Sequence, residues 1–307
     1  MSGPDKPHLA ERAAARLIQE GATPLGAAAR GAPERSPPPL PGISPIPAPV
    51  RMEPLRMEPV RMEPVDPTHR IDMPRLIAAG VAEGGAGRTR IAEEFRLIQN
   101  QLLRAAFGSG ADPGLSNLLM VTSARPNEGK TFSALNLATS IARRGDHQVL
   151  LIDADAKHGS LTDQLGLGDF PGLLELAAKP ELDLTDCVFS SAIPSLSFLP
   201  VGHQRGHRGD VFASNGMMRV IQGLGRRFPD IFIVLDVAPC LSTSDPAALA
   251  PMVGQIIFVV EAERTQRDEV EASLDLIQTC PTITLLLNKV QMSTSHSFGA
   301  YSYSYAS

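Results

Sequence analysis

The chain has 307 residues, 43% of them hydrophobic, and 33 acidic against 28 basic side chains give it a net charge of −5. This composition allows a packed domain of about 200 residues plus extra segments, and without a basic run nothing points to nucleic acid as a partner. The three cysteines are far apart and lack CxxC spacing, which indicates reduced thiols. The sequence has neither an apolar run of about 18 residues nor a signal-peptide core, so we expect a soluble, cytoplasmic protein.

The first segment in chain order, residues 1–85, is rich in proline. Residues 7–20 can form a short amphipathic helix, but sixteen of the 27 prolines lie before residue 76. Residues 51–65 repeat a five-residue unit, RMEPL, RMEPV, RMEPV, which is too short for a solenoid repeat. This pattern is typical of an extended or disordered linker, and a specific docking motif is the alternative. We therefore assign residues 1–85 to a short helix and a proline-rich linker.

Residues 86–295 alternate between apolar runs and helical patterns. The apolar runs fall at residues 118–121, 149–152, 196–201, 231–235, 256–260 and 283–287, and helical patterns fall at 90–107, 130–143, 214–227 and 265–278. Continuous apolar runs separated by helices are typical of strands that are buried on both faces. The sequence thus predicts one α/β domain with a mainly parallel sheet and helices on both faces. Its ligand is expected at the carboxyl ends of the strands.

Residues 118–131, LLMVTSARPNEGKT, have the pattern of a buried strand, a polar loop and the first turn of a helix. The loop ends in Gly129, Lys130 and Thr131, the phosphate-binding end of a P-loop. In this motif the glycine lets the backbone come close, the lysine reaches the β- and γ-phosphates, and the hydroxyl ligates Mg²⁺. Loop N–H groups and the helix N-terminus surround the phosphate oxygens. Ala124 replaces the usual first glycine, but the strand–loop–helix context still predicts a nucleoside triphosphate site.

Three aspartates follow two other strand-like runs. Asp153 and Asp155 stand in VLLIDADAK, and Asp236 stands in IFIVLDVAP. Carboxylates just past strand ends can hold Mg²⁺ and orient a nucleophile opposite a P-loop. Helix capping is the alternative for each one alone. The two neighbouring acids in DADA indicate two different roles. One would bind the metal, and the other would position or deprotonate an incoming hydroxyl.

All three tyrosines of the chain, Tyr301, Tyr303 and Tyr305, lie in its last segment, residues 296–307. Tyrosine normally scatters through cores and interfaces, so its confinement to a tail indicates that the tail is a substrate. A flexible tail of about ten residues extends ~30 Å, enough to enter a neighbouring subunit's site. A Ser/Tyr tail without a role is the alternative.

The segments TSARPNEGKT, LLIDADAK and IVLDVAP together resemble the Walker A, A′ and B motifs of the bacterial tyrosine kinases of capsule and exopolysaccharide assembly. The resemblance covers about residues 68–305, and it extends to EEFRLIQNQLL as an N-terminal helix and LLLNKV as the last core strand. Within this family, the sequence is most similar to the stand-alone, exosortase-associated type, in which the kinase lacks its own membrane anchor. The family implies a P-loop NTPase fold of the Min/Par-like class. It also implies ATP-dependent autophosphorylation on tyrosine, which regulates exopolysaccharide synthesis and export.

The resemblance also implies ATP and Mg²⁺ as cofactors and a role for each matching residue. Lys130 and Asp153 would be catalytic, with Asp153 as the base, while Thr131, Asp155 and Asp236 would hold the metal. The expected nucleotide-binding residues are Asn127, Glu128, Gly129, Lys130, Thr131, Phe132 and Asn288. Asn288 and Lys289, at the end of the last strand, could contact the adenine edge, and capping of the strand end is the alternative.

Three kinds of partner follow from the resemblance. The first is a transmembrane chain-length protein, or co-polymerase, through which the chain would be peripheral at the inner membrane. The others are further copies of the chain and a cognate tyrosine phosphatase. The family's self-association helix often reads ExxRxxR, and here Glu93 and Arg96 are followed by the neutral Gln99.

The main rival function is that of a Min/Par-type ATPase, which uses ATP as a dimerisation switch and phosphorylates no protein. Those ATPases carry a signature lysine five residues before the phosphate-binding one, and Arg125 takes that place here. A basic amphipathic tail for membrane docking is also missing from the sequence. The sequence therefore favours the kinase, and the intact Lys130 and aspartates argue against a non-catalytic scaffold.

Overall fold

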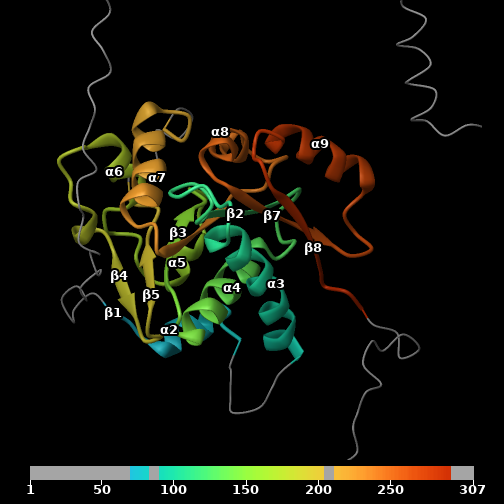
Figure 1. Cartoon of the computed structure of the whole chain (residues 1–307), viewed down its shortest axis with the longest axis horizontal. Helices are drawn as coiled ribbons and strands as arrows, with labels where there is room; N and C mark the ends of the chain where they lie inside the picture. Colours follow the sequence, from blue (N-terminus) through green and yellow to red (C-terminus); the bar gives the residue numbers. More distant parts are fainter. Residues whose placement is uncertain (1–69, 83–89, 204–210, 292–307) are drawn as a thin grey trace, which may run out of the picture. The chain divides into compact units, whose positions relative to one another are not determined.

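An eight-stranded sheet runs through the domain in the order β1-β4-β5-β3-β6-β2-β7-β8 (Figure 1). It belongs to a computed structural model that describes residues 70–82, 90–203 and 211–291. The strands are β1 (Arg70–Ile71), β2 (Leu118–Ser123), β3 (Gln148–Ala154), β4 (Phe189–Ser191), β5 (Leu196–Leu199), β6 (Ile231–Val237), β7 (Gln255–Glu261) and β8 (Ile283–Asn288). Every pairing is parallel except that of β4 with β5. The prediction of a mainly parallel α/β sheet is confirmed.

The helices lie between the strands along the chain. They are α2 (Met73–Ala78), α3 (Arg90–Phe107), α4 (Lys130–Arg144), α5 (Leu161–Gln164), α6 (Leu173–Ala178), α7 (Asn215–Arg227), α8 (Asp245–Leu249) and α9 (Arg267–Ile277), with the short 3₁₀ turns η2 (Leu184–Asp186) and η3 (Ala250–Met252). Within the described ranges, no helix has both the length and the apolar character that are needed to cross a bilayer.

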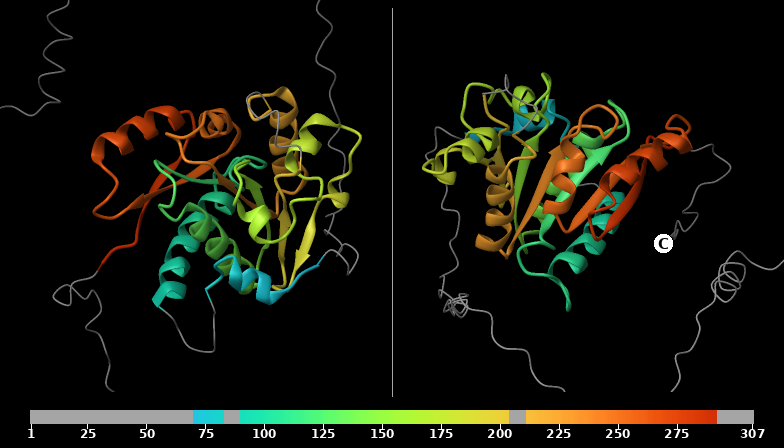
Figure 2. Two further views of the ribbon diagram at one scale, coloured as in Figure 1. Left: turned by 180° about the vertical axis from the view of Figure 1, so that it is seen from behind. Right: turned by 90° about the horizontal axis from the view of Figure 1, so that it is seen from above.

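Two hydrophobic clusters cover the two faces of the sheet, because successive side chains of a strand point to opposite faces. In β2, Leu118 and Met120 belong to the cluster that α6, α7, α8 and α9 cover. Leu119 and Val121 belong to the other cluster, which α2, α3, α4 and α5 cover. The view from above shows this three-layer arrangement (Figure 2). Burial on both faces explains why the central strands have continuous apolar sequences.

The domain begins before the boundary that the sequence analysis sets at residue 86. Arg70 and Ile71 pair with β4, and Ile71, Leu76 and Val81 are buried in the core. The segment ending at Ala82 is tied to α4 as well, because the Ala82 N–H donates to Asn136 Oδ1 at 2.8 Å. Residues 70–82 therefore belong to the folded domain and not to the linker. Their apolar positions are too few and too irregular to stand out from the proline-rich sequence before them.

The sheet also brings the conspicuous acidic residues together. β3 and β6 are neighbours, and their register places Asp153 opposite Asp236. β2 lies on the other side of β6, with Val121 opposite Asp236, and it leads into the P-loop. The carboxyl ends of the three central strands thus meet at the N-terminus of α4, as the Walker-type sequence pattern predicts.

Candidate active site

The P-loop, residues 124–129, joins β2 to α4 and is fixed by polar contacts at both ends. The Cys240 and Leu241 N–H groups, which follow β6, donate to the carbonyls of Ser123 and Ala124 at 2.8 and 3.1 Å. Ser123 Oγ donates to the Arg125 carbonyl at 2.8 Å. These contacts hold the beginning of the loop against the neighbouring strand end, so the loop keeps its shape around the N-terminus of α4.

Gly129 occupies the N-cap of α4 and has a φ of 97°, the left-handed region that favours glycine. A Cβ at this position would overlap the Asn288 side-chain amide. That amide donates to the Glu128 carbonyl at 2.8 Å, and Lys289 Nζ donates to the Asn127 carbonyl at 2.5 Å. The end of β8 therefore clamps the P-loop from the side. Asn288 was expected at the nucleotide, and the structure places it on the loop that would hold the nucleotide.

Glu128 closes the loop from within. Its side chain is buried, with Oε2 accepting the Arg125 N–H at 2.9 Å and Oε1 accepting a short hydrogen bond from the Thr265 hydroxyl. Sequence reasoning missed Thr265, and it singled out Lys289 only as a residue that, with Asn288, could contact the adenine edge. Glu128 thus holds the shape of the loop through its side chain.

The centre of the site is a buried charge cluster. Lys130 Nζ lies 2.8 Å from Asp155 Oδ2 and 3.3 Å from Asp236 Oδ1, and it donates to Thr131 Oγ1 at 3.2 Å. Lys130 is 8% exposed, Asp155 7% and Asp236 not at all. The structure thus unites all four residues that the sequence assigned to phosphate and metal.

Burial and mutual charge control the ionisation of this cluster. Burial alone would lower the pKa of Lys130, but the charges of Asp236 and Asp155 raise it above its usual value. Burial raises the pKa of Asp236 to about 6, against the opposing effect of Lys130. The ammonium is therefore firmly protonated, and the Asp236 carboxyl takes up its proton at a higher pH than an ordinary aspartate.

Asp153 lies beside this cluster but has different contacts. It is fully buried, and its two carboxylate oxygens accept the N–H groups of Asp155 at 3.0 Å and Thr162 at 2.7 Å. Burial raises the pKa of Asp153. A raised pKa suits a general base, while the two backbone contacts also hold the turn between β3 and α5. The predicted role of Asp153 as the base stays a prediction.

The residues fit a magnesium ion. Thr131, Asp155 and Asp236 supply the oxygen ligands that Mg²⁺ prefers, and this ion commonly uses one or two carboxylates together with substrate phosphates. Within the described ranges, Asp236 Oδ2 is buried and has no hydrogen-bond partner, so it is free to accept one from a metal-bound water. The same ranges contain no cluster of three or more His, Cys, Asp or Glu side chains arranged to hold a metal by themselves. Phosphate oxygens would have to complete the shell.

Two other sequence-predicted features lie away from the cluster. Phe132 contacts Phe95 of α3, with 6.2 Å between the ring centroids, and is 37% exposed; its predicted nucleotide contact stays untested. Gln99 is buried between α3 and α4, where its Oε1 accepts the Ser140 hydroxyl at 2.7 Å. It therefore contributes to internal packing and does not continue the exposed face of Glu93 and Arg96. Tyr301, Tyr303 and Tyr305 lie outside the described residues.

The arrangement of the P-loop, Lys130 and the two aspartates at the carboxyl ends of the strands defines the class of protein, a P-loop NTPase.

Comparison with models of known protein families finds no match. Over 195 residues the chain is 26% identical to the tyrosine-protein kinase ptk of Acinetobacter johnsonii, covering 63% of this chain and 26% of that protein. Over 228 residues it is 32% identical to the succinoglycan biosynthesis transport protein ExoP of Rhizobium meliloti, covering 71% of this chain and 27% of ExoP. The solved kinase domain of VpsO matches with a TM-score of 0.52 and 28% identity, covering 66% of this chain and 100% of that domain.

One of these similar proteins is named a tyrosine-protein kinase, one is a kinase domain, and one is named a succinoglycan biosynthesis transport protein. The chain spans about a quarter of the length of the two curated relatives above.

Proposed function

We propose that this protein is an ATP-dependent protein-tyrosine kinase that phosphorylates Tyr301, Tyr303 and Tyr305 of its own tail. The observation that carries the proposal is the buried cluster of Lys130, Asp155 and Asp236 at the P-loop. The order of the chain supports it, because β8, the last strand before the tail in the sequence, ends at Asn288, which contacts the P-loop directly. The similarity to the tyrosine-protein kinase ptk supports the same chemistry.

Each residue of the cluster has a task in this reaction. Lys130 would hold the migrating phosphoryl group, while Thr131, Asp155 and Asp236 would hold Mg²⁺, which when bound neutralises charge on the phosphate oxygens. Asp153 would accept the phenol proton as the tyrosine oxygen bonds to the γ-phosphorus and the bond to ADP breaks. Asn127, Glu128, Gly129 and Asn288 would keep the loop in the shape that the phosphates need.

The tail would act between protomers of a homo-oligomer. Tyr301 lies 13 positions after Asn288, a stretch that extends about 45 Å at most, so the tail is long enough to reach a neighbouring copy. The rate per enzyme molecule should then rise with protein concentration. A rate that is independent of concentration would show transfer within one chain.

The broader setting is also part of the proposal. The name of ExoP, a succinoglycan biosynthesis transport protein, supports a role in regulating the synthesis or export of an exopolysaccharide. The partner would be a membrane co-polymerase that recruits this chain to the inner membrane, as in the exosortase-associated type, and a cognate tyrosine phosphatase would reverse the modification.

Mass spectrometry after incubation of the full chain with Mg²⁺ and ATP tests the proposal. Phosphotyrosine must map to Tyr301, Tyr303 or Tyr305, because the chain has no other tyrosine. The matched control replaces all three with phenylalanine and should retain ATP binding but lose the phosphoryl signal. ATP hydrolysis without phosphotyrosine, even with the partner's cytosolic segment present, would instead support the Min/Par-type switch.

A further inference from the structure

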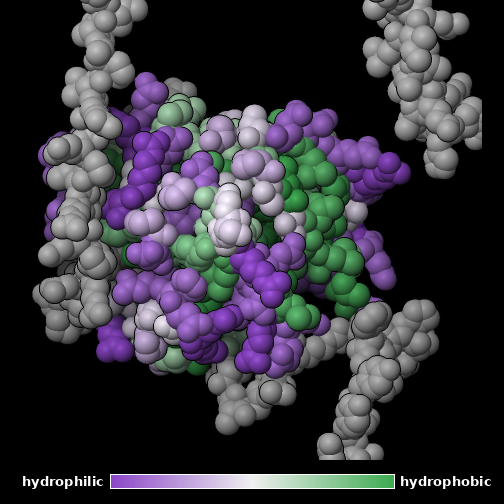
Figure 3. Space-filling view, in the orientation of Figure 1, coloured by the Kyte–Doolittle hydropathy of each residue, from purple (hydrophilic) through white to green (hydrophobic). Residues whose placement is uncertain are grey.

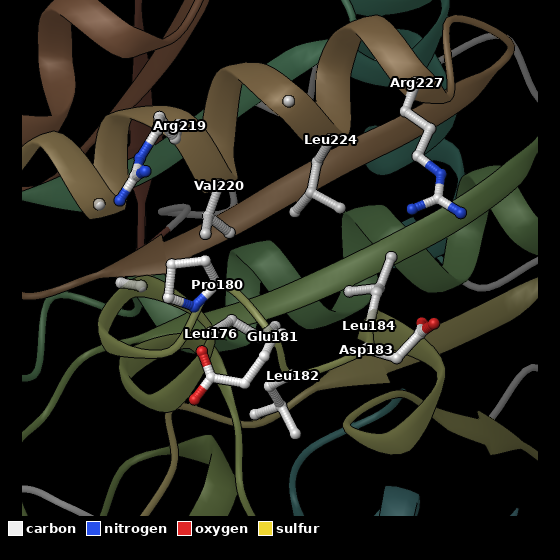
Figure 4. Close-up of a pocket in the computed structure, with 13 residues that line it drawn as sticks. Leu176, Pro180, Glu181, Leu182, Asp183, Leu184, Arg219, Val220, Leu224 and Arg227 are labelled. Atoms are coloured by element: carbon white, nitrogen blue, oxygen red, sulfur yellow. The ribbon is translucent and has the colours of Figure 1, made fainter.

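A groove of about 450 Å³ lies between α7 and the segment that follows α6 (Figure 4). Apolar side chains form its floor: Leu176 and Leu224 are buried, and Leu182, Leu184 and Val220 are half-buried. None of the residues that line it belongs to the P-loop or to the charge cluster. Its size is typical of a cavity that binds a small ligand or a few side chains of a peptide.

The two walls of the groove carry opposite charge. Arg219 and Arg227 project from α7, and Glu181 and Asp183 lie on the facing segment (Figure 4). All four residues are exposed. A ligand that matches this groove therefore needs an apolar group between one basic and one acidic group.

The proline-rich sequence before the domain contains such a ligand. Residues 57–65 read MEPVRMEPV, in which Met62 stands between Arg61 and Glu63. Proline favours the polyproline II conformation, and so does the position before a proline. This helix has three residues per turn, so three successive side chains point about 120° apart. One of them can face the floor while its neighbours face the two walls, and methionine adapts well to irregular apolar cavities.

The tether has the right length and direction. Arg70 pairs with Ser190, six residues after Leu184, so Leu184 lies within about 26 Å of Arg70. Met62 is eight residues before Arg70 and can reach about 28 Å from it. Because β1 and β4 are parallel, the chain before Arg70 and the chain before Ser190 approach from the same end of the strands. A ligand segment that runs from the groove into Arg70 would therefore need no reversal of chain direction.

We propose that this groove binds residues 57–65 of the same chain. Met62 packs on the apolar floor, Arg61 faces Glu181 and Asp183, and Glu63 faces Arg219 and Arg227. The repeat is then an internal docking motif that fixes one end of the linker to the α6–α7 side of the kinase domain. This role is independent of the proposed tyrosine phosphorylation.

Photocross-linking in the full-length protein tests the proposal. Met62 is replaced by p-benzoylphenylalanine, the dilute protein is irradiated, and the attachment site is mapped by mass spectrometry. The expected product has the mass of a single chain and carries the link in peptides that contain residues 176–184 or 217–224. Absence of a cross-link, attachment elsewhere in the chain, or a cross-linked dimer would each overturn the proposal.

A pair of variants on α7 supplies the control. Gly223 lines the groove, and a Cβ there would meet no atom within 4 Å, so Gly223→Gln adds a side chain at the groove from a position with open space. Met218 lies on the same helix, is 40% exposed and does not line the groove. The cross-link should be lost with Gly223→Gln and kept with Met218→Gln, while both variants keep the circular dichroism spectrum of the unchanged protein. Equal cross-linking in the two variants would contradict docking in this groove.

Discussion

The centre of the domain buries charged side chains, whereas the β8 edge of its sheet exposes apolar ones. At the centre, Lys130 is 8% exposed and Asp236 is fully buried. At the edge, Leu285 and Leu287 expose 55% and 60% of their surface, and apolar side chains gather on that side of the molecule (Figure 3). Buried charges interact strongly because the interior screens them poorly, whereas exposed leucines have little burial energy to lose. Substitutions should therefore be costly at the centre and nearly neutral at the edge.

The largest effect is expected from Lys130→Met. Loss of the ammonium should reduce tyrosine phosphorylation roughly a thousandfold, because the charge that stabilises the migrating phosphoryl group disappears. The measurement is the initial rate of phosphotyrosine formation. Lys289→Met is the matched control, since Lys289 also contacts the loop but bonds only to the Asn127 carbonyl there. A comparable loss in both variants would mean that loop shape, not charge at the phosphates, limits the reaction.

Asp153→Asn should have the next largest effect. If Asp153 is the base, phosphorylation falls by roughly a hundredfold or more, while ATP binding measured by calorimetry stays nearly intact. The thermal midpoint should also fall, because an amide cannot accept both backbone N–H groups that the carboxylate accepts. Equal losses of binding and transfer would make Asp153 a structural or metal-holding residue.

The same Lys130→Met substitution should destabilise the nucleotide-free fold by about 3 kcal/mol at pH 8, because it leaves Asp155 and Asp236 buried without their partner. Because the pKa of Asp236 is raised to about 6 in the folded state, the Asp236 carboxyl holds its proton more tightly there than in the unfolded chain. The ionised carboxylate therefore lowers the free energy of unfolding as the pH rises through about 6. The destabilisation should therefore shrink at pH 5. Urea unfolding at the two pH values measures it, and a pH-independent difference would show that lost packing dominates.

A smaller effect is expected from pH alone. Since burial raises the pKa of Asp236 to about 6, the carboxylate takes up a proton below that value and stops serving Mg²⁺. Phosphorylation should then fall about tenfold per unit of pH below the midpoint. Higher Mg²⁺ should move the midpoint down, because the metal favours the ionised form. A midpoint that does not respond to Mg²⁺ would assign the titration to another group.

The smallest effect is expected at the edge. Leu285→Ser should change the free energy of unfolding by less than about 0.5 kcal/mol, and phosphorylation should be unchanged. Leu235→Ser in the fully buried β6 is the matched control and should cost several kcal/mol. A large loss of stability from Leu285→Ser would mean that this side chain is covered in solution.

The central strands and the P-loop were predictable because their physical causes are local in sequence. A strand that is buried on both faces needs a continuous apolar run, and a phosphate site needs Gly129, Lys130 and Thr131 in that order. The paired acids were predictable because each follows such a run. Only the register of β3 and β6 places Asp153 opposite Asp236, and the sequence contains no direct signal for it.

The contacts that sequence reasoning did not predict join residues that are distant in the sequence. Thr265 meets Glu128 across 137 positions, and Lys289 meets Asn127 across 162. Gln99 resembled a position on an exposed helix face, but the packing of α3 on α4 buries it. The segment 70–82 joins the domain through a two-residue strand that pairs with β4, which is too short to leave a periodic pattern.

The position of the Lys130 ammonium affects the order in which ligands enter the site. Because it already neutralises Asp155 and Asp236, free Mg²⁺ arriving first would have to compete with a covalently attached cation for the same carboxylates. When a nucleotide arrives with its metal, its phosphates give the Lys130 ammonium new anionic partners as the ammonium leaves Asp155 and Asp236. We therefore expect the metal to enter as the Mg–ATP complex, with the lysine acting as an internal counter-ion that keeps bare divalent cations out of an empty site.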